Sequence, residues 1–233
     1  MRRHLVWSFC AVALVGGSIA APAASAQQAV NLYIGAFVPH GMDSRGGDDV
    51  LFRNADFLRF NIKDFTGVTA GGEYLVGLND FIDAGLGVGI YSRTSPAAYR
   101  DLVFNTNGGE IRQDWKLRIV PMTATIRLLP LGHRDAITPY IGGGVGIYAW
   151  RYSETGEFVD VNKDVFRDTF IGSGTAVGPV VLGGLRVPIG SGGIGFEIRY
   201  HGGHGELPAS ETFAGPKIDL GGFNYLATFT IGL

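Results

Sequence analysis

The chain has 233 residues, a formal net charge of −2 and one cysteine, Cys10. Its Lys and Arg residues are scattered along the sequence, which excludes the clustered basic surface of a nucleic-acid-binding protein. One cysteine excludes an intrachain disulfide framework, and 37 glycines without a three-residue period exclude a collagen-like chain.

Residues 1–26 have the three regions of a secretory signal peptide. Arg2 and Arg3 supply the positive charge, residues 5–17 are mostly apolar, and residues 24–26 (Ala-Ser-Ala) supply the small side chains at a cleavage site. The apolar stretch is shorter than the ~20 residues that a membrane-spanning helix needs. We therefore expect this segment to be cleaved after export.

Residues 27–233 are expected to form one domain of strands in which apolar and polar residues alternate. In residues 193–200, Phe196 and Ile198 point to one face and Glu197 and Arg199 to the other. The pattern recurs in segments of roughly ten residues, the length that crosses a bilayer as a tilted strand. In chain order the expected strands are residues 30–38, 67–77, 81–94, 115–129, 137–152, 176–187, 193–201 and 223–233.

The links between these strands alternate in length. Short turns rich in Gly, Pro, Asn and Asp alternate with long connections, which is the layout of periplasmic turns and extracellular loops in an outer-membrane barrel. We therefore predict an all-β fold, an eight-stranded antiparallel up-and-down transmembrane β-barrel with four long extracellular loops. The short turns are residues 78–80, 130–136 and 188–192, and the long loops are residues 39–66, 95–114, 153–175 and 202–222. A weak helical pattern appears only near residues 50–60.

Each strand presents an uncharged apolar face, which we assign to lipid, and a face with Gly, Thr and charged residues, which we assign to the lumen. Pro121 interrupts the strand at residues 115–129, because it has no amide hydrogen for the ladder. We expect a bulge there that allows Leu117 and Ile119 to face lipid together with Met122.

The inward face carries a balanced set of charges. They are Glu73, Asp83, Glu197, Arg127, Arg186 and Arg199, accompanied by Tyr33, Tyr140 and Tyr148. An eight-stranded barrel is just wide enough for its own side chains, and buried charges must be paired. We therefore predict a lumen charge network that fills the barrel, with a narrow polar conduit as the alternative. Inward glycines in the strands either receive bulky neighbouring rings or leave a cavity.

No cofactor and no metal site are predicted. His201, His204 and Glu206 form a weak metal-binding candidate, because two histidines and a carboxylate lie close together in the sequence. They stand at the start of a Gly-rich loop, where ligand geometry would not be preorganised.

Two segments carry a resemblance to a known group of proteins. Residues 138–146 (TPYIGGGVG) and 225–233 (YLATFTIGL), with the alternating strands and the signal peptide, resemble small outer-membrane β-barrel proteins. This group includes the OmpA transmembrane domain, OmpX and the OmpW-like proteins, and the resemblance covers essentially all of residues 27–233. The family usually ends in an aromatic residue, whereas Leu233 ends this sequence.

The resemblance implies an integral protein of the Gram-negative outer membrane, porin-like or OmpA-like, that is not an enzyme. Its expected role is structural, adhesive or in small-molecule permeability. The implied partners are outer-membrane lipid and lipopolysaccharide, periplasmic chaperones, the barrel-assembly machinery and an extracellular ligand held by the loops. No nucleic-acid partner is expected.

Two alternatives remain open from the sequence. Residues 199–201 and Glu206 resemble part of the site of lipid A deacylases, which implies a barrel-embedded lipid A-modifying enzyme. The expected serine is replaced by Gly203, Ser210 lies far along the loop, and a triad needs its nucleophile beside its base. A soluble periplasmic ligand-binding barrel of the lipocalin kind would also have eight strands, but it would not require the long–short alternation of links.

Overall fold

The computed structural model describes residues 27–104, 108–133 and 136–233. The predicted signal peptide, residues 1–26, lies outside the described residues. Within the described ranges, none of the helices has the length and apolar character that a membrane crossing requires.

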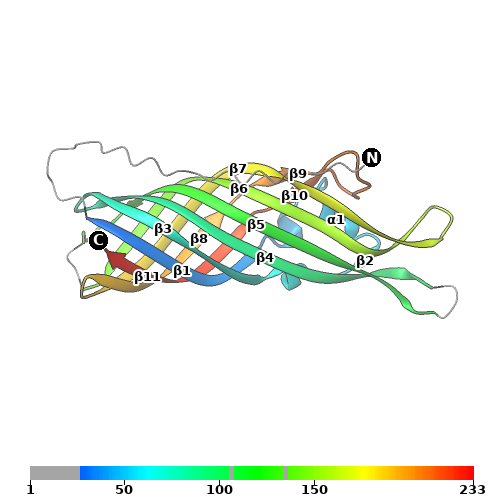
Figure 1. Ribbon diagram of the computed structural model, residues 1–233, viewed down its shortest axis with the longest axis horizontal. Helices are drawn as coiled ribbons and strands as arrows, with labels where there is room; N and C mark the ends of the chain where they lie inside the picture. Colours follow the sequence, from blue (N-terminus) through cyan, green and yellow to red (C-terminus); the bar gives the residue numbers. More distant parts are fainter. Residues whose placement is uncertain (1–26, 105–107, 134–135) are drawn as a thin grey trace, which may run out of the picture.

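Eight long antiparallel strands form a closed ring (Figure 1). The ring follows chain order, and it closes where blue β1 pairs with red β11. Closure leaves no unpaired strand edge and satisfies the backbone polar groups that hydrocarbon cannot solvate. The predicted up-and-down barrel is confirmed. Its strands are β1 (Gln28–Pro39), β3 (Gly67–Asn79), β4 (Ile82–Val103), β5 (Glu110–Leu128), β6 (Thr138–Val159), β7 (Val165–Ile189), β8 (Gly192–His201) and β11 (Gly222–Gly232).

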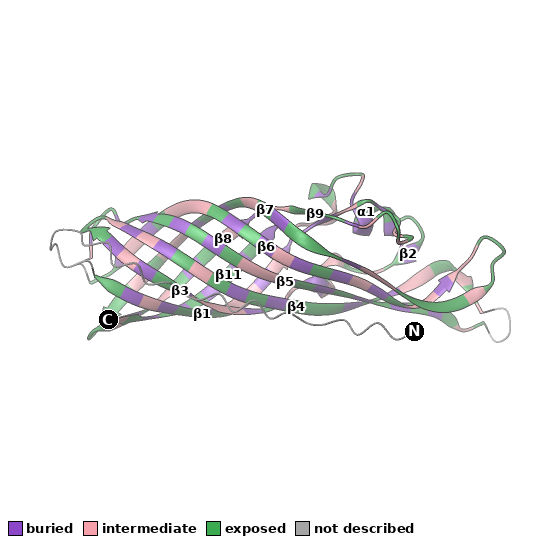
Figure 2. Ribbon diagram, turned by 45° about the horizontal axis from the view of Figure 1, so that its top comes forward, coloured by how far each residue is buried: buried purple, intermediate pink, exposed green. Residues whose placement is uncertain are grey.

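The outer face of the barrel carries an apolar belt. Val68, Leu86 and Val177 are 68%, 65% and 69% exposed, and the residues that we assigned to lipid lie on this outer side, except Leu117 and Ile119. Among the described residues the belt holds no charged side chain, as expected because one Arg or Lys at the bilayer midplane costs roughly 2–4 kcal/mol. On the inner face, the assigned threonines and all the inward carboxylates are buried. Figure 2 shows this alternation of buried and exposed residues along each strand.

Strands β4 to β7 are much longer than predicted. β6 has 22 residues and β7 has 25, and with β4 and β5 they form two hairpins that project beyond the belt (Figure 1). The predicted loops at residues 95–114 and 153–175 are therefore wrong, because most of their residues are strand. Above the belt the apolar face of the strands points inward and the polar face points outward. Trp115 is buried inside the barrel, while Lys116 and Arg118 are exposed outside.

The predicted bulge at Pro121 is also wrong. The pairing of β5 with β6 runs through Pro121 without a shift, and the pairing with β4 keeps the same register on both sides of it. Leu117 and Ile119 therefore point inward, and each is 1% exposed. The physical reason is that β5 has left the bilayer at this level, so its apolar side belongs to the interior.

The connection between β1 and β3 folds over the extracellular mouth of the barrel. It contains η1 (Met42–Ser44), α1 (Val50–Asn54), β2 (Leu58–Arg59) and η2 (Ile62–Phe65). Asp49 caps α1 by accepting hydrogen bonds from the amides of Leu51 and Phe52 at 2.9 and 3.1 Å. The expected helical segment near residues 50–60 is thus a single short helix.

A second small sheet, β9 (His204–Glu206) with β10 (Lys217–Asp219), completes this cover. Its Ile218 and the Val50 and Leu51 of α1 pack with Trp115, Trp150, Tyr148, Tyr152 and other buried residues of the barrel wall. We call this group the apolar cluster. It gives the extracellular half a conventional hydrophobic core.

The reversal of faces can be tested by cysteine labelling, because Cys10 is the only cysteine and lies in the predicted signal peptide. Leu117→Cys should stay unreactive toward a membrane-impermeant maleimide on intact cells, whereas Arg118→Cys should react readily. Mass spectrometry of the folded protein measures both. A bulge at Pro121 would turn Leu117 toward lipid and Arg118 toward the lumen. Failure of Arg118→Cys to react, with folding verified by gel migration, would therefore contradict the reversal of faces.

Candidate functional site

The lumen of the membrane-spanning half contains a compact charge network of Glu73, Arg127, Glu197 and Arg199. Arg127 donates from Nη2 to Glu73, and the same nitrogen lies 2.9 Å from Glu197 Oε2. Arg199 donates from Nε to Glu197 Oε1 at 2.8 Å and from Nη2 to Glu73 Oε2 at 3.2 Å. Thr125 Oγ1 donates to Glu73 Oε1 at 3.0 Å. Two carboxylates and two guanidinium groups neutralise one another.

Two tyrosines extend this charge network. The Tyr140 hydroxyl donates to Glu197 Oε2 at 3.0 Å, and its ring lies 4.9 Å from the Arg127 guanidinium carbon. The centre of the Tyr33 ring lies 5.1 Å from the guanidinium carbon of Arg199. Cation–π contacts of this kind offset part of the cost of burying each guanidinium.

Inward glycines make room for these groups. A Cβ atom at Gly85 would lie 2.5 Å from Glu73 Oε1, and one at Gly184 would lie 2.5 Å from the Tyr140 hydroxyl. Of the two outcomes left open by the sequence, these glycines receive neighbouring side chains and do not line an open cavity.

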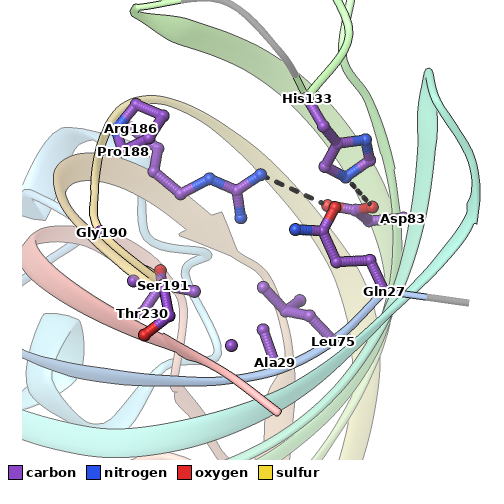
Figure 3. A pocket seen from close by; sticks show the side chains of 12 residues that line it. Gln27, Ala29, Leu75, Asp83, His133, Arg186, Pro188, Gly190, Ser191 and Thr230 are labelled. Atoms are coloured by element: carbon purple, nitrogen blue, oxygen red, sulfur yellow. Dashed lines mark hydrogen bonds and ion pairs between the residues drawn. The ribbon is translucent and has the colours of Figure 1, made fainter.

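Asp83 and Arg186, the other two inward charges, lie apart from this group. They line a cavity of about 210 Å³ at the periplasmic end (Figure 3). Asp83 Oδ1 lies 2.8 Å from His133 Nε2, and Asp83 Oδ2 lies 3.8 Å from Arg186 Nη2. The sequence reasoning missed His133, which lies in a predicted turn with no pattern linking it to Asp83.

The lumen is closed between its two ends. Above the charge network lies a cavity of only about 10 Å³, lined by Tyr33, Thr123, Arg199 and their neighbours. Above that, the apolar cluster fills the barrel. The network and this cluster therefore separate the periplasmic cavity from the cell surface.

His201, His204 and Glu206 do not converge on one point. His201 is buried in the lumen, where its Nε2 donates to the Leu220 carbonyl at 3.1 Å and its Nδ1 accepts from Asn224 at 3.0 Å. His204 and Glu206 are exposed on β9. Among the described residues, no cluster of side chains suited to a metal ion is present.

The extracellular half contains a pocket that the sequence did not predict. We call it the aromatic pocket. It has a volume of about 270 Å³ and lies between the β6–β7 hairpin, the β1–β3 connection and the segment between β9 and β10. Glu154 lines it, and burial raises the pKa of this carboxyl from its usual value near 4.5 to about 7. Glu154 was missed because it fell in a predicted loop.

An antiparallel barrel that is apolar outside and polar inside is built for the outer membrane, since only closed barrels and helices satisfy the backbone in lipid. The fold is that of the small outer-membrane β-barrels.

Comparison with known proteins gives distant similarities to solved structures. No protein-family model and no curated protein matches the chain. A similar solved structure is neisserial surface protein A, at 12% identity and a TM-score of 0.46, covering 88% of this chain and 96% of that one.

Two further similar structures come from other bacteria. The N-terminal β-barrel domain of Pseudomonas aeruginosa OprF has 10% identity and a TM-score of 0.37, covering 89% of this chain and 99% of that one. Ail, the attachment invasion locus protein of Yersinia pestis, has 9% identity and a TM-score of 0.37 in its complex with the heparin analogue sucrose octasulfate. That match covers 88% of this chain and 99% of Ail. Function must therefore be derived from this chain's own residues.

The stability of the barrel should depend on the charge network. Arg127→Leu leaves Glu73 and Glu197 with Arg199 alone, so it should lower the free energy of unfolding by about 3–5 kcal/mol. Urea unfolding in phospholipid vesicles, followed by heat-modifiable gel migration, measures the change. Arg167→Leu removes an exposed pair with Glu157 and is the matched control, with an expected loss below about 1 kcal/mol. Equal losses in the two variants would show that the network is not stabilising.

Proposed function

We propose that this protein is a closed outer-membrane barrel that acts at the cell surface through its extracellular half, in an adhesive or ligand-binding role. The observation that carries this proposal is the blocked lumen. The charge network occupies the membrane-spanning half and the apolar cluster occupies the extracellular half. A diffusion channel would require both to open.

The extracellular half supports a surface role. β4 to β7 continue as paired strands above the belt, so the projecting hairpins are held by backbone hydrogen bonds and by the packed interior. Rigid elements hold a binding surface more precisely than flexible loops do. The aromatic pocket lies among them.

A deacylase role finds little support in the site. Both ring nitrogens of His201 are engaged with the backbone of Leu220 and the side chain of Asn224, and its ring stacks against Phe37 and Tyr148, each at 5.0 Å between centroids. A base in this position faces the interior and has no serine partner among its hydrogen bonds. We therefore propose a non-enzymatic protein.

A soluble ligand-binding barrel is disfavoured by the exterior. Such a barrel would keep its apolar face inside, whereas here the apolar belt surrounds the whole outer surface of the membrane-spanning half. Export through periplasmic chaperones and insertion by the barrel-assembly machinery form part of this proposal.

The upper boundary of the belt supports contact with outer-leaflet glycolipid. Arg118 and Arg151 lie directly opposite each other on β5 and β6, both exposed, with Ser92 and Ser173 as their outer neighbours. Neither arginine has an ion-pair partner among the described residues. Like charges directly opposite each other destabilise a strand pair. A phosphate group of lipopolysaccharide placed between them would remove that cost.

A closed lumen predicts electrical silence. Purified protein inserted into planar lipid bilayers should give no steady unit conductance, while a porin inserted by the same procedure provides the positive control. Folding is verified by heat-modifiable gel migration of the same protein preparation reconstituted into vesicles of the same lipid. A reproducible open level in the unmodified protein would overturn the closed-barrel proposal.

The glycolipid contact predicts a specific loss. Adding lipopolysaccharide should raise the unfolding temperature of the unmodified protein in detergent, and Arg118→Gln combined with Arg151→Gln should remove most of that rise. Arg112→Gln, higher on the same face of β5, should leave the rise unchanged because Arg112 already pairs with Glu110. An undiminished rise in the double variant would exclude this contact.

A further inference from the structure

The aromatic pocket is built by five parts of the chain that are distant in sequence. The β1–β3 connection, β4, β5, the β6–β7 hairpin and the segment between β9 and β10 each contribute to a cavity of about 270 Å³. It lies above the apolar belt, because the outward residues of β6 become polar from Arg151 onward. The pocket is thus open to the cell exterior and not to lipid.

The walls of the pocket are aromatic. Phe158 contacts Phe166 and Phe170 at 5.8 and 4.7 Å between ring centroids, and Phe170 lies 6.3 Å from Phe213. On the other side Phe57 lies 6.4 Å from Tyr99. Phe57 and Phe166 are 43% and 40% exposed, so their faces remain available to a ligand. Aromatic faces attract both apolar groups and cations.

The polar group of the pocket is Glu154. Its residue is 4% exposed, and its Oε1 accepts hydrogen bonds from Asn54 Nδ2 and the Tyr152 hydroxyl, both at 2.9 Å. Within the described part of the chain, Oε2 accepts no hydrogen bond and Glu154 has no ion-pair partner. A buried carboxylate without a cation is costly.

The groups that face Glu154 do not supply that cation. Tyr152 on its own strand and Tyr99 on β4 both have a pKa raised by burial, and Asn54 on α1 is uncharged. The positive charge that acts on Tyr152 is that of Arg45, which is already paired with Asp49 at 3.0 Å. Facing residues from β5 and β7, Gln113 and Phe170, carry no charge.

We propose that the aromatic pocket binds a small organic cation, an ammonium group attached to an apolar or aromatic body, with Glu154 as its counter-ion. The phenylalanine rings would enclose the body and the carbons next to the ammonium group. The ammonium would donate to Glu154 Oε2, while Asn54 and Tyr152 keep Oε1 in place. This site deepens the surface role proposed above and rests on it.

The experiment compares two probes of the same skeleton, phenethylamine and 2-phenylethanol. The full-length mature protein is placed in phospholipid nanodiscs, because detergent would compete for an apolar pocket, and binding is measured by titration calorimetry. Phenethylamine should bind at least about tenfold more tightly than 2-phenylethanol at about pH 8. Its affinity should fall at least about tenfold toward about pH 5.5, because Glu154 gains a proton over that range while the amine stays charged.

Variants identify the counter-ion. Glu154→Gln retains an acceptor for Asn54 and Tyr152, so it should fold, yet it should lose both the preference for the cation and the pH dependence. Glu157→Gln, three residues along the same strand and outside the lining of the pocket, is the matched control and should keep both. Phe158→Ala should weaken the binding of both probes.

Each contrary outcome has one meaning. Equal binding of the two probes, unchanged in Glu154→Gln, would show an apolar pocket and overturn the proposal. Binding of a neutral methyl glycoside without amine binding would assign the pocket to sugars and overturn it too. If the unmodified protein binds no amine and gives no conductance in planar bilayers, the pocket proposal is overturned and the closed surface barrel is retained. Steady conductance would overturn the closed-barrel function and leave the amine site untouched.

Discussion

In hydrocarbon, every backbone amide and carbonyl must find its partner within the protein. For a chain of strands this requirement means closure, and here β1 pairs with β11 from Ala29 to Pro39, along the whole of β11. Closure in turn fixes which side chains face lipid, because successive residues alternate between the two faces. Any charge carried by a membrane-spanning strand must then lie in the lumen. The neutral charge network of Glu73, Arg127, Glu197 and Arg199 is the consequence, since a narrow lumen tolerates charges only when they are paired.

Above the bilayer the polar and apolar faces of the same strands exchange places. Once water replaces lipid outside, the polar face turns outward and the apolar face packs inward around α1 and the β9–β10 hairpin. The interior thus changes from ion pairs in the membrane-spanning half to an apolar cluster in the extracellular half. Leu117, Ile119 and Thr123 lie on one continuous face of β5 and mark this change. A single uninterrupted register serves two environments.

The sequence could predict the parts of the fold that depend on lipid. Contact with lipid explains why outward residues such as Leu86 and Val88 are uncharged in an exported chain. The strands, their lipid-facing sides and their order in the ring could therefore be predicted. It could not predict how far the strands extend. Outward Arg112 and Asp114 break the lipid-facing pattern, so the part of β5 before Trp115 was mistaken for a loop.

The same limit explains which parts of the site were found. The inward charges were found because each interrupts an apolar strand. Their division into a central quartet and a separate Asp83–Arg186 pair depends on strand stagger, which the sequence does not specify. Glu154 and His133 act through partners distant in the chain, Asn54 and Asp83, and no local pattern joins them.

The placement of tryptophan has a consequence for how folding can be observed. Of the three tryptophans, Trp7 lies in the predicted signal peptide, and Trp115 and Trp150 both lie in the apolar cluster. Intrinsic fluorescence of the mature chain therefore reports on the extracellular half alone, while gel migration reports on the ring in the bilayer. Following both signals over time would therefore separate closure of the ring in the bilayer from packing of the extracellular half. A lag between them would give the interval during which an inserted ring is still uncovered at its outer mouth.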